Sequence, residues 1–175
     1  GKLGSLLGGI LGSTAASVGN LIAEGNKQRI LNVYWELLAI RFWIAGIFSF
    51  ALYNLLPPFI ELWLGCEYVL SADILILVIL AFVLGIIRTA TDEFKEGYGL
   101  FSDVWAPFVE CAISITIAVV CGKYWGLSGV LLGGIISTLV IVYIWHPYYL
   151  FTRGLKCSVM TYVLQFLKNV TVLFV

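Results

Sequence analysis

Hydrophobic residues in this chain form long, nearly uninterrupted runs that are separated by short polar stretches. A membrane-spanning helix needs about 20 predominantly apolar residues, and these runs approach that length. None shows the strict alternation of a half-buried strand, so helices are favoured over a β-barrel. The six predicted spans are residues 3–23, 37–56, 69–87, 104–122, 127–145 and 159–175. We therefore predict an all-α fold, a polytopic transmembrane helical bundle with about six membrane spans.

Proline residues mark the predicted ends of two of these spans. Proline has no backbone N–H and disrupts a helix interior. We expect Pro57–Pro58 to end the span at 37–56, and His146–Pro147 to end the span at 127–145. The stretch 59–68 is too short to cross a membrane, so we expect it to lie along the outer interface as a half-buried turn.

Small residues recur at intervals of four in two of the predicted spans. In the first they are Gly4, Gly8, Gly12 and Ala16, followed at the same spacing by Asn20; in the fifth they are Gly129, Gly133 and Ser137. Residues four apart lie on one helix face, and small side chains let helix backbones approach closely. The pattern predicts tight helix contacts, with Asn20 adding a polar group that could line a cavity.

Composition agrees with a membrane protein and excludes several other classes. Of the 175 residues, 61% are hydrophobic and 11% are charged, whereas a typical soluble domain has about 25% charged residues. The net charge is zero, so nothing indicates nucleic-acid binding. The four cysteines lack CxxC spacing and the single histidine has no partner at a ligand interval. We predict no metal site, no cofactor and no catalytic constellation, and hence no enzyme.

Charge is distributed unevenly between the segments that join the predicted spans. If the spans alternate in direction, one side carries Lys27, Arg29, Arg88, Lys95, Arg153 and Lys156, and the other carries Lys2 and Lys123. The positive-inside rule places the first side in the cytoplasm. Residues 88–110 alone hold seven of the twenty charged residues. We expect this island to be a solvated cytoplasmic loop between two spans.

Four charged residues fall inside predicted spans, where ionisable groups usually face a cavity or a partner. One of them, Lys168, interrupts the span predicted at 159–175. Arg41 either extends its guanidinium to the interface or faces a central cavity. Asp73 is interpreted as a carboxylate at a helix start. Glu110, with Ser114 one turn further on, predicts a polar stripe that faces a water-filled interior.

Four stretches together resemble one family of membrane transporters. They are STAASVGNLIAEGN at 13–26, PPFIELWLGCEYVLS at 57–71, GLFSDVWAPFVE at 99–110 and KYWGLSGVLLGGIIS at 123–137. In this order and spacing they resemble the Wzx-type polysaccharide (O-antigen or lipopolysaccharide) flippases, of the superfamily shared with the MATE exporters. The resemblance implies that residues 1–175 are part of a MATE-like C-terminal lobe, whose partner is an N-terminal lobe of the same protein.

The resemblance also implies a function and a set of site residues. Such proteins move undecaprenyl-pyrophosphate-linked oligosaccharide units across the bacterial inner membrane by alternating access. They are multi-pass proteins in contact with membrane lipids, and some are coupled to a cation, H⁺ or Na⁺. On this resemblance Arg41 is a candidate for the lining of the central cavity, and Glu110 for a coupling or gating carboxylate. Together with the polar groups of Asn20 and Ser114 they form the predicted substrate-binding set, and Arg88 and Asp103 are the predicted gating residues of the cytoplasmic loop. The chain departs from the family pattern at Val104 and His146, where relatives often carry a basic and an acidic residue.

Two other functions fit the same pattern of spans. A MATE-like antiporter of drug or metabolite cations would share the architecture. A membrane-embedded polysaccharide polymerase or ligase would need a large outer loop with catalytic polar residues. The predicted outer linkers, 57–68 and 123–126, are short, which disfavours the enzyme.

Overall fold

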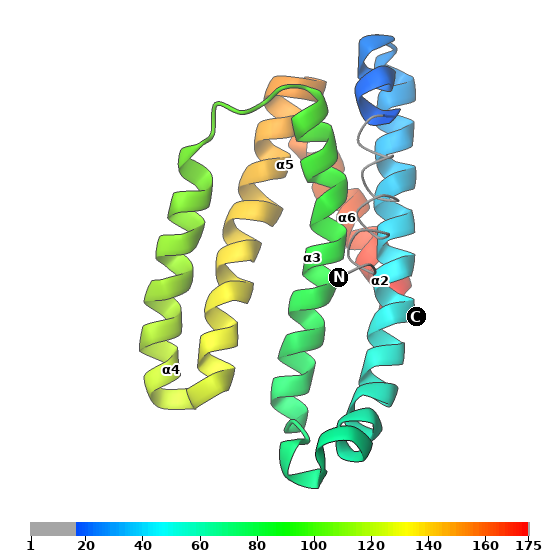
Figure 1. The fold of residues 1–175 in the computed structure, drawn as a ribbon. Helices are drawn as coiled ribbons and strands as arrows, with labels where there is room; N and C mark the ends of the chain where they lie inside the picture. The colour runs from blue at the N-terminus through cyan, green and yellow to red at the C-terminus, as the bar shows by residue number, and fades with distance from the viewer. Residues whose placement is uncertain (1–16, 175) are drawn as a thin grey trace.

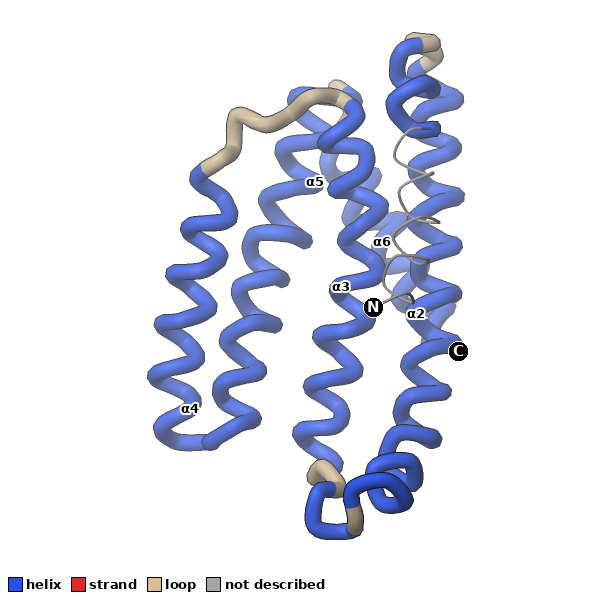
Figure 2. The backbone as a smooth tube through the Cα atoms, in the orientation of Figure 1, coloured by secondary structure: helices blue, strands red, loops and turns tan. Residues whose placement is uncertain are grey.

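The computed structural model describes residues 17–174, and all regular secondary structure in that range is helical. The long helices are α2 (Lys27–Leu64), α3 (Ala72–Gly97), α4 (Trp105–Val140) and α6 (Val159–Phe174). The short elements are η1 (Cys66–Tyr68), η2 (Ile141–Trp145), α5 (His146–Tyr149) and η3 (Leu150–Leu155). The prediction of an all-α fold is confirmed. Loops are short, and the longest joins α3 to α4 (Figure 2).

Three helices within residues 17–174 are long and apolar enough to cross a membrane: Lys27–Leu64, Ala72–Gly97 and Trp105–Leu155. These helices are compatible with a membrane protein, but the predicted count of about six spans is not confirmed. Most of the segment predicted at 3–23 lies outside the described residues. The segment predicted at 159–175 corresponds to α6, of which 16 residues are described.

The helix that begins at Trp105 folds back on itself at Gly126. This glycine has φ 57° and ψ −132° inside the helix, a conformation that residues with a Cβ rarely adopt. The two limbs, which match the segments predicted at 104–122 and 127–145, run side by side in opposite directions (Figure 1). Together they form a helical hairpin, which we call the α4 hairpin.

Small residues hold the limbs of the α4 hairpin close together, as predicted for the fifth segment. A Cβ added at Gly133 would lie 2.6 Å from the Ser114 carbonyl oxygen, and one at Gly129 would meet the carbonyl group of Cys121. Ser137, at the next position of the pattern, is buried. The glycines of the first predicted span lie outside the described residues.

The prediction that Pro57–Pro58 ends a helix is wrong. Helix α2 continues to Leu64 and ends where Gly65 donates its N–H to the carbonyls of Ile60 and Glu61. Proline removes a hydrogen bond and bends a helix without necessarily ending it, and the last turns of α2 bend toward the start of α3 (Figure 1). Most of the stretch predicted as an interfacial turn is therefore helical.

The prediction that His146–Pro147 ends a helix is also wrong. The second limb of the α4 hairpin continues through η2, α5 and η3 to Leu155, and Lys156 follows in a left-handed conformation with φ 52°. The N–H of His146 bonds to the carbonyl of Ile141, five residues back. This wider π-type turn relieves the clash between a proline ring and the carbonyl four residues before it. His146 therefore lies on a helix, not in a loop.

An aromatic core joins α2, α3, η3 and α6. Tyr34 packs edge-on against Phe94 and Phe151 with ring centroids 5.1 and 5.6 Å apart, and its hydroxyl lies 3.1 Å from Thr91 Oγ1. Outside this core the helices expose large apolar side chains, such as Phe50 at 74% exposure. Exposed apolar surface of this kind suits contact with lipid.

Candidate functional site

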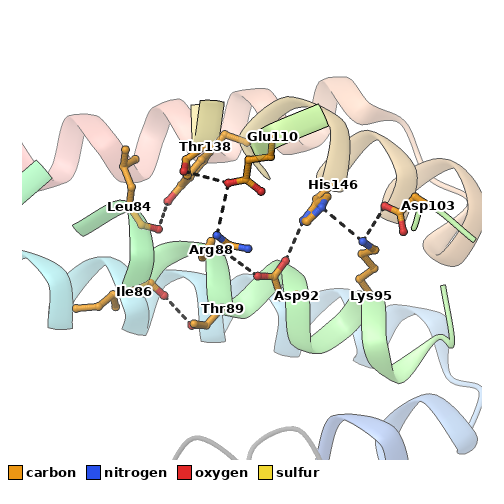
Figure 3. A network of polar contacts seen from close by, with 11 residues as sticks. Leu84, Ile86, Arg88, Thr89, Asp92, Lys95, Asp103, Glu110, Thr138 and His146 are labelled. Carbon is orange, nitrogen blue, oxygen red and sulfur yellow. Dashed lines mark hydrogen bonds and ion pairs between the residues drawn. The ribbon is translucent and has the colours of Figure 1, made fainter. Parts of the chain in front are cut away.

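The charged island at 88–110 is mostly helical, which corrects the prediction of a solvated loop. Residues 88–97 belong to α3, and 105–110 begin α4, so only 98–104 form a connection. Arg88, Asp92 and Lys95 are spaced by four and three residues and so lie on one face of α3. That face is turned toward α4 and α5, and its charges pair with each other and with residues on those segments while Arg88 and Asp92 stay partly exposed (Figure 3).

The first half of the pairing joins α3 to both limbs of the α4 hairpin. Arg88 donates from Nε to Asp92 Oδ2 at 3.0 Å. Its Nη1 lies 3.9 Å from Glu110 Oε1, which accepts a hydrogen bond of 3.3 Å from Thr138 Oγ1. A carboxylate on the first limb is thus tied to an arginine on α3 and a hydroxyl on the second limb.

The second half centres on His146, whose side chain is buried. Its Nδ1 lies 2.9 Å from Asp92 Oδ1, and its Nε2 lies 3.5 Å from Lys95 Nζ. Lys95 also pairs with the buried Asp103, in the connection before α4, at 2.7 Å. We call the six ionisable residues the interhelical charge network: Arg88, Asp92, Lys95, Asp103, Glu110 and His146.

A separate ion pair lies between α2 and α3. Arg41 Nη2 donates to Glu93 Oε1 at 2.7 Å, and both side chains are almost fully buried. Glu93 Oε2 is buried without a hydrogen-bond partner. From the sequence, Arg41 was expected either to reach the interface or to face a cavity. It is paired instead with a carboxylate from within the island, 52 residues later.

The structure brings together some of the predicted site residues and not others. Glu110, Arg88 and Asp103 belong to the interhelical charge network. Ser114 lines a cavity of about 350 Å³ between α3 and the α4 hairpin, and so does Thr138, the partner of Glu110. Arg41 is held by Glu93 instead, and Asn20 is exposed on the helical segment 17–23.

Sequence reasoning missed Asp92, Lys95 and His146 as site residues. The spacing of Arg88, Asp92 and Lys95 along a helix was a usable signal for the α3 face. The partnership with His146 was not visible, because it joins residues 54 positions apart. Within residues 17–174 no group of three His, Cys, Asp or Glu side chains could hold a metal ion.

Comparisons with protein families, with curated proteins and with solved structures find no match for this chain.

Proposed function

We propose that this chain is part of a transporter that flips undecaprenyl-pyrophosphate-linked oligosaccharide units across the bacterial inner membrane by alternating access. One observation carries the transport proposal: a partly buried charge network lies between helices that are long and apolar enough to cross a membrane. Ionisable groups in such positions typically mark transport pathways. The substrate class rests on the resemblance of the four sequence stretches to polysaccharide flippases.

The interhelical charge network has the properties expected of a gate. It connects α3 to both limbs of the α4 hairpin beside the cavity lined by Ser114 and Thr138. Water or charged groups of a substrate can replace one partner of an ion pair, which lets the paired helices separate. Packed interfaces change between discrete arrangements and do not deform continuously. A charged hydrogen bond is worth about 1.5–3 kcal/mol, and about 1.4 kcal/mol changes an equilibrium tenfold. This magnitude suits the pair of Lys95 with the buried Asp103, whereas partly exposed pairs such as Arg88–Asp92 contribute about 1 kcal/mol or less.

The proposal predicts that Arg88→Gln lowers surface polysaccharide by up to about fivefold when the complete protein is expressed in a flippase-deficient strain. Glutamine removes the charge that faces Asp92 and Glu110. Arg153→Gln is the matched control, because Arg153 is exposed, and it should leave the polymer unchanged. Polymer is measured by gel profile, with protein amount measured in parallel.

The same strains distinguish the alternatives. Failure of the unaltered protein to restore polymer, together with lowered accumulation of a cationic dye, would replace the flippase with a cation exporter. Export of lipid-linked units with changed polymer length would indicate the polymerase or ligase.

We further propose that the end of the bundle bearing 98–104 faces the cytoplasm, as the positive-inside rule implies. Helices α2 and α3 end at opposite ends of the bundle (Figure 1). Glu61 lies near the end of α2 and Glu96 near the end of α3, and both are exposed. In a background without the native cysteines, Glu61→Cys should react with a membrane-impermeant thiol reagent in intact cells. Glu96→Cys should react only after permeabilisation. The reverse pattern would invert the orientation.

A further inference from the structure

Lys168 places a positive charge on the side of α6 that is turned away from α2. The two helices meet where the rings of Phe166 and Phe42 lie 5.4 Å apart between centroids. Lys168 follows Phe166 by two residues, which places it about 200° around the axis of α6, opposite this contact. Lys168 is exposed, and within residues 17–174 it forms no ion pair.

The contacts of α6 place Lys168 below the level of the membrane interface. Tyr162 lies against Trp35 of α2 with ring centroids 6.4 Å apart, and Trp and Tyr are the residues that favour the interface. From this pair α6 runs beside α2 toward the middle of the bundle (Figure 1). Lys168 is six residues beyond Tyr162, about 9 Å along the helix, and the hydrocarbon core is about 30 Å thick. The backbone of Lys168 therefore lies well inside the core.

Three large apolar side chains accompany Lys168 on what we call the outer face of α6. Met160, Leu164 and Lys168 are spaced by four residues and so share one face, and Leu167 adjoins them. Lipid alone does not suit this face, because a charged side chain in the hydrocarbon core pairs with another charge or faces a cavity. Open water does not suit the apolar side chains, which are 65%, 64% and 55% exposed. A packed helix that brings one opposite charge suits both.

No carboxylate of this sequence supplies that opposite charge. All ten Asp and Glu residues lie within the part of the chain that the structure describes, and none of them pairs with Lys168. Glu93 and Glu110, on two of the candidate spans, already pair with Arg41 and Arg88. A second copy of the chain would bring the same pairs. The partner of Lys168 therefore comes from outside these 175 residues.

We propose that the outer face of α6 docks a transmembrane helix from elsewhere in the complete protein, and that this helix carries an Asp or Glu opposite Lys168. The apolar side chains supply the packing, and the ion pair fixes the register of the two helices. The inference rests on the proposal that the chain is part of a larger transporter, but not on the cargo of that transporter.

The occupant of the outer face is identified with a nitroxide on Leu164→Cys in the complete protein, in lipid nanodiscs and without the native cysteines. Collisions with molecular oxygen, which concentrates in lipid, and with a water-soluble nickel chelate report the surroundings of the label. We expect weak collisions with both, because a packed helix excludes them. Strong collisions with oxygen would show that lipid covers the face, and strong collisions with the chelate would show a water-filled cavity. Either result would overturn the proposal.

A nitroxide on Ile47→Cys is the control for the collision measurement. Ile47 is 65% exposed on α2, and its neighbour Gly46 lines the same groove as Asn169 of α6, which places the two labels at similar depth. This label should collide strongly with oxygen.

The opposite charge is tested by substitutions of Lys168. Lys168→Arg keeps the charge and should accumulate like the unaltered protein. Lys168→Met leaves the partner carboxylate unpaired in the membrane, so the amount of folded protein should fall severalfold, and Lys168→Glu should lower it further. If lipid covered this face, Lys168→Met would remove a costly charge and raise the amount instead.

Lys123→Met is the matched control, because Lys123 is exposed at the turn of the α4 hairpin, and it should leave the amount unchanged. Folded protein is measured as the monodisperse fraction in size-exclusion chromatography. An unchanged or raised amount of Lys168→Met would contradict the docking. Neither measurement uses a transported substrate, so restored polymer together with a lipid-covered outer face would refute the docking and leave the transporter in place.

Discussion

Replacing Gly133 with alanine is expected to reduce the stability of the α4 hairpin sharply, and leucine should abolish folded protein. The added Cβ would lie 2.6 Å from the Ser114 carbonyl oxygen and 2.8 Å from the Ala118 amide nitrogen. Both atoms belong to backbone, so the strain is relieved only if the two limbs separate. Overpacking of this kind costs about 1–3 kcal/mol or more.

The neighbouring glycine provides a matched control. A Cβ at Gly134 meets no atom within 4 Å, and alanine is a better helix former than glycine by about 1 kcal/mol. Gly134→Ala should therefore be as stable as the unaltered protein or more so. Thermal stability in detergent, followed by the monodisperse fraction in size-exclusion chromatography, separates the two variants. Equal stability of Gly133→Ala and Gly134→Ala would show that Gly133 does not hold the limbs together.

The second large effect is expected at the buried pair between α2 and α3. Arg41→Met leaves the Glu93 carboxylate buried without its partner, which costs about 3–5 kcal/mol. The double variant Arg41→Met/Glu93→Met removes both charges and keeps similar volume, so it should recover most of this loss. Protein amount and thermal stability of the two single variants and the double variant form a complete cycle.

Transport by the double variant then separates the two roles that Arg41 could have. Normal protein amount with full polymer would mean that the arginine serves the α2–α3 contact alone. Normal protein amount without polymer would mean that the substrate needs the guanidinium, whose fork of donors suits phosphate. A double variant as unstable as Arg41→Met would contradict the assignment of Glu93 as the partner.

The sequence predicted the features of this fold that depend on local chemistry. Apolar runs indicated helices, and the spacing of Gly129 and Gly133 indicated a close helix contact, both of which the structure contains. Helix ends were predicted less well. Pro57 and Pro147 were treated as terminators, whereas one helix bends and the other widens its turns around the ring.

The candidate site was harder to predict because its contacts join distant parts of the chain. The charged residues of the island were expected to face solvent, because charged side chains in an exposed loop are hydrated and need no protein partner. Pairing depends on which helix faces meet, and Glu93 meets Arg41 only because α2 packs on α3. Single positions such as Glu110 were identifiable from their apolar surroundings, while the histidine at the centre of the network had no local signal.

The π-helical turns on either side of α5 also determine the direction in which the residues beyond them point around the helix axis. Each π turn adds a residue, which rotates everything beyond it by about 100° relative to an ordinary α-helix. Shifting such a turn along the limb exchanges one set of backbone hydrogen bonds for another. Residues between η2 and η3, His146 among them, can then turn about the helix axis while the rest of the hairpin stays in place. Conformational change at this site could therefore proceed by torsion within a single helix, without a rigid-body tilt.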